Sequence, residues 1–374
     1  MCLTPAGQTV LVRPEMKALD SVPFVLAFGA VVACGAGAAA TGGGATPVDV
    51  VDASTAIDAA IEASAPPPDA GIADAVLADA AVAVEDTDGA ADGGAACGVC
   101  PSYPPWRRTT TFAAYPLNEL SGIVASRRDP GIVYAHNDSG DQPRFFAVEA
   151  ETGKARGEFL LKGVQAIDWE DIALGPCTAG TCVFLGDIGD NSHIRASISI
   201  YVVPEPALDP AKGKAELTAF ERWTLHYPDG AHDAETLLVD PRSGDLFIVT
   251  KELFGRGALY ALPRPYVGNA AMTLRRLNTI QIPSVTTTLI TGGDVHPCAP
   301  RVVLRSYGRV FEFRGSKQGD VASWLSGPPA LVIEGAPEPQ GEAMAYRADG
   351  FGLYSSTEIP AGSMPAPLAA TSCR

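Results

Sequence analysis

Short apolar strands recur in pairs along the chain from about residue 110 onward. In most pairs the first strand opens on an acidic or amide residue, and the second strand ends in polar residues. Turns rich in Asp, Pro and Gly separate the two strands, as a hairpin requires. Each pair is therefore interpreted as the inner hairpin of one sheet. The first strands lie at 119–123, 168–172, 233–237, 292–295 and 340–344, and the second strands lie at 133–137, 183–187, 246–250, 302–306 and 352–356.

Outer strands with alternating apolar residues follow at 144–148, 198–202 and 258–262. A repeat of roughly 50 to 60 residues built from short strands, without long helical periodicity, is typical of a propeller blade. The pattern predicts an all-β fold, namely a single β-propeller with five blades counted. A sixth blade could lie within residues 209–228 or 317–339, so the sequence does not decide between five and six blades. An unpaired sheet edge would stay exposed, so we expect a strand near 109–114 to close the ring in the last blade, beside the C-terminal segment.

The propeller is expected to span 107–374, and residues 35–106 have a different composition. The part from 35 to 96 consists largely of Ala, Gly, Asp, Thr and Pro, with no Lys or Arg. It cannot bury enough apolar area to offset chain entropy, which predicts a disordered acidic tether. The tether carries most of the formal net charge of −16. No Lys/Arg cluster with interleaved aromatic residues occurs in the chain, which argues against a nucleic-acid partner.

An export signal precedes the tether. Its apolar core at 22–32 is too short to span a bilayer and ends in small residues. Residues 16–34 resemble a bacterial lipoprotein signal, because 31–34 match the lipobox and would leave an acylated Cys34 as the first mature residue. Residues 1–15 would then be an over-called start, and the alternative is a plain secretory signal. We expect the protein in the cell envelope, lipid-anchored to a membrane and facing the periplasm or the exterior.

Export changes the interpretation of the cysteines, because disulfides form in oxidising compartments. Cys97 and Cys100 are expected to be disulfide-bonded to each other rather than to act in redox chemistry. Cys177 and Cys182 bracket a hairpin turn and are expected to clamp it. Cys298 and Cys373 remain and could tie down the C-terminus, although the sequence leaves the pairing open.

Carboxylates recur at equivalent positions of the inner strands. In a propeller such positions face one another around a central channel. Packed together, these groups would repel and raise each other's pKa unless a cation lies among them. Ca²⁺ is the natural candidate, because it accepts several oxygen ligands in loose geometry. The inner-strand candidates for metal ligands are Glu119, Glu170, Glu235, Asp294 and Glu342.

The second strands end with further oxygen donors. Asn137 and Asp187 extend the candidate metal site, with a local turn as the alternative for the run at 186–191. His136 and Asp187 are candidates to activate water. Lys251 and Arg305 could instead neutralise the ring without metal. Glu358, near another strand end, is expected to matter much less.

Six motifs in order carry a resemblance to an exported bacterial propeller family of unassigned activity. More distantly, the chain is similar to phytase-like and SdiA-regulated propellers. The resemblance covers about residues 110 to 360. It implies calcium at the channel mouth and, for some relatives, phosphoester or ester hydrolysis. The motifs lie at 119–123, 136–140, 168–172, 186–191, 227–235 and 339–343.

Two functions from different classes follow. In the first, a calcium ion held by the carboxylates polarises a phosphoryl or carbonyl oxygen, and the protein is a metal-assisted hydrolase. In the second, calcium is structural, and the mouth binds a small-molecule or polymer ligand or a surface partner. In both cases we expect a monomer that reaches the membrane only through its lipid anchor.

Overall fold

The computed structural model describes residues 97–209, 213–283, 288–316, 320–359 and 365–374. These residues belong to one compact unit. The predicted signal, Cys34 and the tether up to residue 96 lie outside the described residues. Within the described part, no helix is long and apolar enough to cross a membrane.

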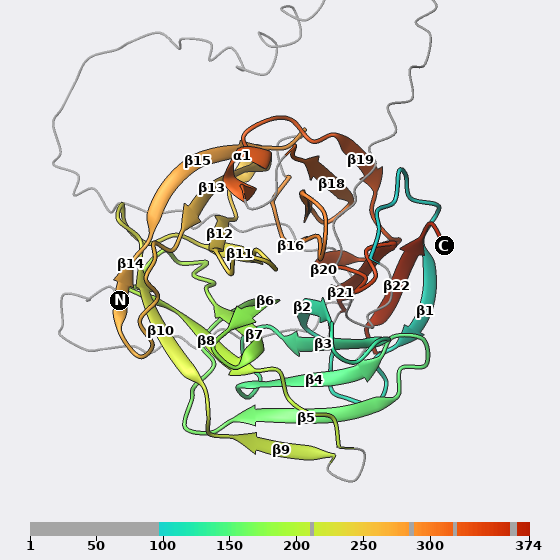
Figure 1. Ribbon diagram of the computed structural model, residues 1–374, viewed down its shortest axis with the longest axis horizontal. Coiled ribbons are helices and arrows are strands. Elements are labelled where there is room, and N and C mark those ends of the chain that lie inside the picture. The colour runs from blue at the N-terminus through green and yellow to red at the C-terminus, as the bar shows by residue number, and fades with distance from the viewer. Residues whose placement is uncertain (1–96, 210–212, 284–287, 317–319, 360–364) are drawn as a thin grey trace, which may run out of the picture. The chain divides into compact units, whose positions relative to one another are not determined.

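Five sheets are arranged around a central axis, each with its first strand innermost (Figure 1). In blade 1, β9 (Lys214–Leu217) extends the sheet by pairing in parallel with the outer strand. In blade 2, β14 (Ala271–Thr273) does the same. The other strands of blade 1 are β2 (Leu120–Ala125), β3 (Ile132–Asn137), β4 (Arg144–Glu149) and β5 (Ala155–Leu161). Those of blade 2 are β6 (Trp169–Cys177), β7 (Gly180–Asp187), β8 (Ile198–Pro204) and β10 (Glu221–His226).

The remaining three sheets are four-stranded. Blade 3 comprises β11 (Ala234–Val239), β12 (Leu246–Thr250), β13 (Arg256–Ala261) and β15 (Arg275–Gln281), with the 3-10 turn η2 (Leu253–Gly255) between its second and third strands. Blade 4 comprises β16 (Gly292–Val295), β17 (Arg301–Arg305), β18 (Arg309–Arg314) and β19 (Leu331–Glu334), with the short helix α1 (Val321–Trp324) before the last strand. Blade 5 comprises β20 (Gln340–Tyr346), β21 (Gly352–Glu358), β22 (Pro367–Ser372) and β1 (Arg107–Thr111).

The prediction of an all-β propeller is confirmed, and the number of blades is five. The segment 209–228, where a sixth blade was possible, supplies β9 and β10 to the sheets of blades 1 and 2. The described part of 317–339 supplies α1 and β19 to blade 4. Both segments therefore widen existing sheets.

The ring closes between the two ends of the domain. Strand β1 pairs antiparallel with β22, from Arg107 opposite Ala370 to Thr111 opposite Pro367. The closing strand predicted near 109–114 is therefore confirmed, and in Figure 1 it lies beside the C-terminal strand. Residues from both ends therefore share one sheet, in which β22 is paired on both sides and β1 is the outer strand.

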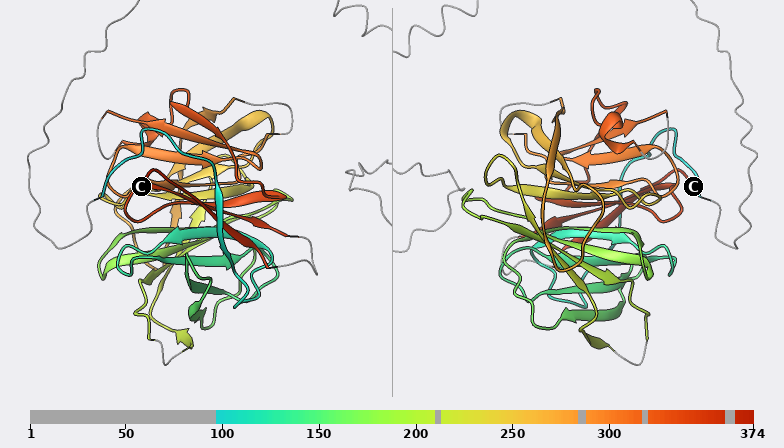
Figure 2. Two further views of the ribbon diagram at one scale, coloured as in Figure 1. Left: turned by 90° about the vertical axis from the view of Figure 1, so that its right-hand side faces the viewer. Right: turned by 60° about the vertical axis from the view of Figure 1, so that its left-hand side comes forward.

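The core consists of apolar clusters between neighbouring sheets rather than a single centre. For example, Trp169 of blade 2 and Tyr134 of blade 1 belong to one cluster, and both are fully buried. The other clusters join blades 2 and 3, 3 and 4, 4 and 5, and 5 and 1. The sheets stand face to face around the axis, as the side views in Figure 2 show. This packing holds the inner strands rigidly around the channel.

The described residues form three disulfides, and one expectation about them is wrong. Cys177 and Cys182 do clamp the β6–β7 hairpin. Cys97, however, bonds to Cys298 of blade 4, and Cys100 bonds to Cys373 at the end of blade 5. The segment that begins at Cys97 crosses the seam between these blades, so each cysteine meets a different partner across it.

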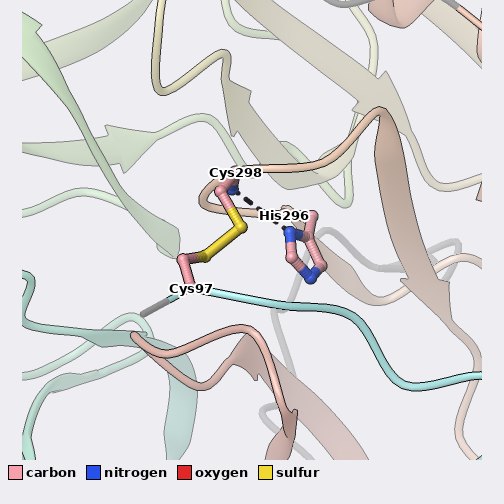
Figure 3. Close-up of side chains that lie close together, drawn as sticks. All are labelled: Cys97, His296 and Cys298. Carbon is pink, nitrogen blue, oxygen red and sulfur yellow. Dashed lines mark hydrogen bonds between the residues drawn. A yellow bond between two sulfur atoms is a disulfide. The ribbon is translucent and has the colours of Figure 1, made fainter. Parts of the chain in front are cut away.

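His296 lies beside the first of these bonds. Its Nδ1 accepts a hydrogen bond from the Cys298 amide at 3.2 Å (Figure 3). Because both sulfur atoms are already joined to each other, this group of side chains is a structural clamp and not a metal site.

Candidate metal centre at the channel mouth

A β-bulge near the start of the inner strand builds the site in four blades. In blades 1, 2 and 3 the bulge leaves one residue without a partner in the hairpin ladder, and in blade 5 two residues lie opposite one. A bulge re-aims the side chain it carries. The register shifts lie between Leu120 and Gly122, Trp169 and Asp171, Ala234 and Thr236, and Gly341 and Met344. The polar residues within these bulges are Ser121, Glu170, Glu235 and Glu342.

Eight carboxyl groups surround the channel mouth in two layers. The inner carboxylates are buried, and the outer carboxylates are half-buried or exposed. Oxygen atoms of Asp138, Asp168 and Glu170 lie within 4.8 Å of one another, and so do those of Glu170, Asp233 and Glu235. Glu170 belongs to both groups and joins the layers. The inner carboxylates are Glu170, Asp233, Glu235 and Glu342, and the outer carboxylates are Glu119, Asp138, Asp168 and Glu358.

Burial and mutual repulsion raise the pKa of three inner carboxylates, Glu170, Glu235 and Glu342. Burial, then the charges of Glu235 and Glu358, raise the pKa of Glu342 to about 9. Burial raises the pKa of Glu235 to about 7 although Lys251 opposes the shift, and burial together with Glu235 raises that of Glu170 well above its usual range. Without a cation these side chains hold protons near neutral pH, so a bound cation would compete with protons for them.

The pKa values of Asp138 and Asp168 in the outer layer are raised less. Burial raises the pKa of Asp138 to about 6, and burial with the neighbouring charges of Asp138 and Asp233 raises that of Asp168 to about 6. Both side chains are therefore ionised at pH 7. The mouth keeps a negative rim even where the inner groups are protonated.

One cation reaches into this group. Lys251, which follows β12, forms an ion pair with Glu235. The other oxygen of that carboxyl group, Glu235 Oε2, is buried and has no hydrogen-bond partner among the described residues. Lys251 therefore neutralises part of the mouth, as the metal-free alternative required, but it leaves an acceptor unsatisfied that a cation would complete.

Arg305, the other basic residue expected to neutralise the carboxylates, lies between blades 4 and 5 instead. Its guanidinium is fully buried and pairs with Glu338 at 3.1 Å. It also donates to the carbonyl oxygen of Ala343 at 2.9 Å and to the hydroxyl of Ser355 at 2.8 Å. Arg305 thus links blades 4 and 5 rather than balancing the carboxylates at the mouth.

Asp294 is not brought to the mouth. Its Oδ1 accepts from the Val295 amide at 2.8 Å, its Oδ2 accepts from the Tyr346 amide at 2.9 Å, and its charged neighbour is Arg127. Strand β16 pairs with β17 in continuous register over its four described pairs, without the bulge of the other inner strands. A shift of one residue turns a side chain to the other face, so alignment by sequence spacing misplaced this one.

Asn137 and Asp187 hold the loops that carry outer carboxylates. Asn137 Oδ1 accepts from the Glu119 amide at 3.3 Å, and its amide group donates to the Pro116 carbonyl at 2.6 Å. Asp187 accepts from the Asp168 amide at 3.1 Å and pairs with Arg195 at 2.7 Å. Both side chains therefore position neighbours, and their oxygen atoms are already engaged.

His136 is fully buried below the mouth. Its Nδ1 lies 2.8 Å from the carbonyl oxygen of Asn137, and its ring packs edge-on against Trp169. A Cβ on Gly122 would lie 2.2 Å from Nε2, so only glycine leaves room for this ring. Burial lowers the pKa of His136 to about 4, which keeps the imidazole neutral at pH 7.

Glu358 was expected to matter little, yet it lies at the mouth. Hairpin register places it opposite Gln340, and an isolated bridge places it opposite Glu119. Gln340 also donates to Glu342 at 3.0 Å. The sequence held no signal for Glu358, because its position depends on the register of β20 and β21.

Neither a protein-family model nor a curated protein matches the chain. Among solved structures, the chain is similar to the structure of U3-55K, with a TM-score of 0.37 and 10% identity over 72% of this chain and 98% of that chain. It is also similar to the crystal structure of RRP9 WD40 repeats, with a TM-score of 0.38 and 10% identity over 73% of this chain and 99% of that chain. Scores this low carry no argument about function.

Proposed function

We propose that the protein is an exported, lipid-anchored β-propeller that binds Ca²⁺ at its channel mouth and acts as a binding module. The observation that carries this proposal is the buried group of Glu170, Asp233 and Glu235, whose oxygen atoms lie within 4.8 Å of one another. Ca²⁺ takes six to eight oxygen ligands in flexible geometry, and the inner carboxylates offer oxygens from three different blades. The unpartnered Oε2 of Glu235 supports a cation in the same place.

A binding role is favoured over hydrolysis by the surroundings of the two residues expected to activate water. His136 is fully buried against Trp169 and Gly122, and it has no exposed surface from which to reach a substrate. Asp187 is engaged by Arg195 and by two backbone amides. The distant similarity to phytase-like propellers remains the support for the hydrolase, and it is an argument from fold alone.

Export and anchoring are part of the proposal. Three disulfides support export, because such bonds persist in oxidising compartments. An acylated Cys34, followed by the acidic tether, would hold the propeller away from the membrane surface in the cell envelope.

Calcium titration of the full chain by calorimetry tests the site. We expect wild-type protein to bind Ca²⁺, and Glu235→Gln to weaken the affinity by roughly tenfold or more, because the substitution removes one charged ligand. The matched control is Glu334→Gln on β19, an exposed glutamate whose ion pair with Arg309 lies at the surface. Absence of calcium binding by the wild type would refute the metal site.

A panel of phosphoester and ester substrates, assayed with and without Ca²⁺, separates the two functions. The binding module predicts no calcium-dependent turnover. Turnover that is lost in Glu235→Gln and kept in Glu334→Gln would instead establish the hydrolase.

A further inference from the structure

Exposed apolar side chains gather on the face that carries the mouth. Seven large apolar side chains are exposed among the described residues, and four of them lie on loops at this end of the channel. Ile194 is 80% exposed and Phe254 is 49% exposed. Single exposed apolar residues need no explanation, but several around one charged opening indicate a contact surface. The four residues, called here the apolar fringe, are Ile167, Ile194, Leu253 and Phe254.

Short connections tie the apolar fringe to the carboxylates. Ile167 directly precedes Asp168. The amide of Ile194 donates to Asp190 at 3.0 Å, and the amide of Asp190 donates to Asp233 at 2.8 Å. Leu253 and Phe254 form the turn η2, which begins two residues after Lys251. The fringe therefore borders the mouth on blades 2 and 3.

Phe254 is held in an uncommon conformation. Its φ of 66° lies in the left-handed region that bulky side chains rarely adopt. The Gly255 amide, next in the chain, donates to the Thr288 carbonyl at 2.7 Å and fixes this turn. The turn keeps an aromatic ring half in solvent, although a buried position would be more favourable for it.

The charge of the mouth determines which partner fits. One divalent ion among the inner carboxylates, together with Lys251, cannot neutralise all eight carboxyl groups. The basic side chains closest to the mouth, Lys251 and Arg195, pair with Glu235 and Asp187 instead, and no ion pair of the described residues involves an outer carboxylate. An anionic surface would be repelled, and a cationic group would be attracted.

We propose that this face binds a polypeptide segment in which a basic side chain is flanked by apolar ones. The basic group contacts the outer carboxylates, and its apolar neighbours cover the fringe. Glu235 Oε2 is buried and has no hydrogen-bond partner among the described residues, so the mouth contains an acceptor that Lys251 does not satisfy. This inference goes beyond the proposed calcium site, because the small ion occupies the inner layer and the partner uses the outer one.

Fluorescence anisotropy with short blocked peptides tests the inference on the full chain. We expect a labelled Gly-Leu-Lys-Leu-Gly peptide to bind, and the same peptide with Glu in place of Lys, or with Ser in place of both Leu residues, to bind at least tenfold more weakly. Raising the salt concentration should weaken binding of the lysine peptide, because exposed charges are screened.

Variants place the contact on the fringe. Leu253→Ser and Ile194→Ser should each weaken binding of the lysine peptide by about tenfold, since each removes the burial of one apolar side chain. Val332→Ser, an equally small change at an exposed position on β19, should leave binding unchanged. All three positions are exposed, so the folded state is retained.

Several outcomes would overturn the inference: equal binding of the lysine and glutamate peptides, equal effects of Val332→Ser and Leu253→Ser, or binding of phosphatidylglycerol vesicles in place of the peptide. The calcium titration is read separately. Peptide binding without calcium binding would refute the proposed metal site and leave the peptide-binding inference intact. Calcium binding without peptide binding would refute the peptide-binding inference and leave the metal site intact.

Discussion

Replacing Glu342 with glutamine should make the calcium-free protein more stable at neutral pH. Below pH 4.5 the glutamate is protonated in both the folded and the unfolded state, so it contributes no difference. Above that value the unfolded chain releases the proton, but the folded protein keeps it up to its pKa of about 9. Stability is therefore lost as the pH rises, by about 1.4 kcal/mol for each pH unit. The loss reaches about 3 kcal/mol at pH 7.

Urea denaturation of wild type and Glu342→Gln, in EDTA from pH 4.5 to pH 8, measures this effect. We expect equal stability at pH 4.5 and an advantage of about 3 kcal/mol for the variant at pH 7, because glutamine does not titrate. Saturating Ca²⁺ should narrow this difference, since a ligand that binds only the folded state stabilises it by about 2.7 kcal/mol at one hundred times its Kd and the wild type keeps one more carboxylate for the ion. Glu334→Gln, at an exposed position, is the control. Parallel profiles of wild type and Glu342→Gln in EDTA would refute the reasoning.

Two further predictions concern the blade 4–5 seam and the anchor. Arg305→Met leaves the buried carboxyl group of Glu338 without its cation and should lower the free energy of unfolding, measured with urea, by about 3 to 5 kcal/mol. Arg309→Met, at the exposed pair with Glu334, should lower it by at most about 1 kcal/mol. Equal losses in the two variants would contradict the structural role of Arg305. Cys34→Ala should move the protein from the membrane fraction to the soluble fraction of the envelope, and retention in the membrane would contradict lipid anchoring.

The periodic strand pattern was sufficient to predict the propeller, because strand alternation and turn residues are local properties of the sequence. The site was harder to predict. Glu170 and Glu235 lie in one group with Asp233, and the charge of Glu235 acts on Glu342, since bulges at similar places in their strands preserve the spacing; their convergence on one cation stays a prediction. Asp294 was misplaced, because its strand lacks the bulge, and the position of Glu358 opposite Gln340 and Glu119 depends on strand pairing that the sequence does not show. Bulges and register are set by tertiary pairing, which one sequence does not reveal.

The two disulfides near residue 97 also determine how the domain responds to a pull from its N-terminal side. A force along the chain before Cys97 enters the propeller at Cys298 and at Cys373, and it reaches β1 only after both covalent bonds. The hydrogen bonds of the β1–β22 ladder, which would otherwise peel open one at a time from the end, lie outside this load path. While the two disulfides are intact, a pulling force from the N-terminal side therefore does not load the β1–β22 ladder, and their reduction would transfer that force to its hydrogen bonds.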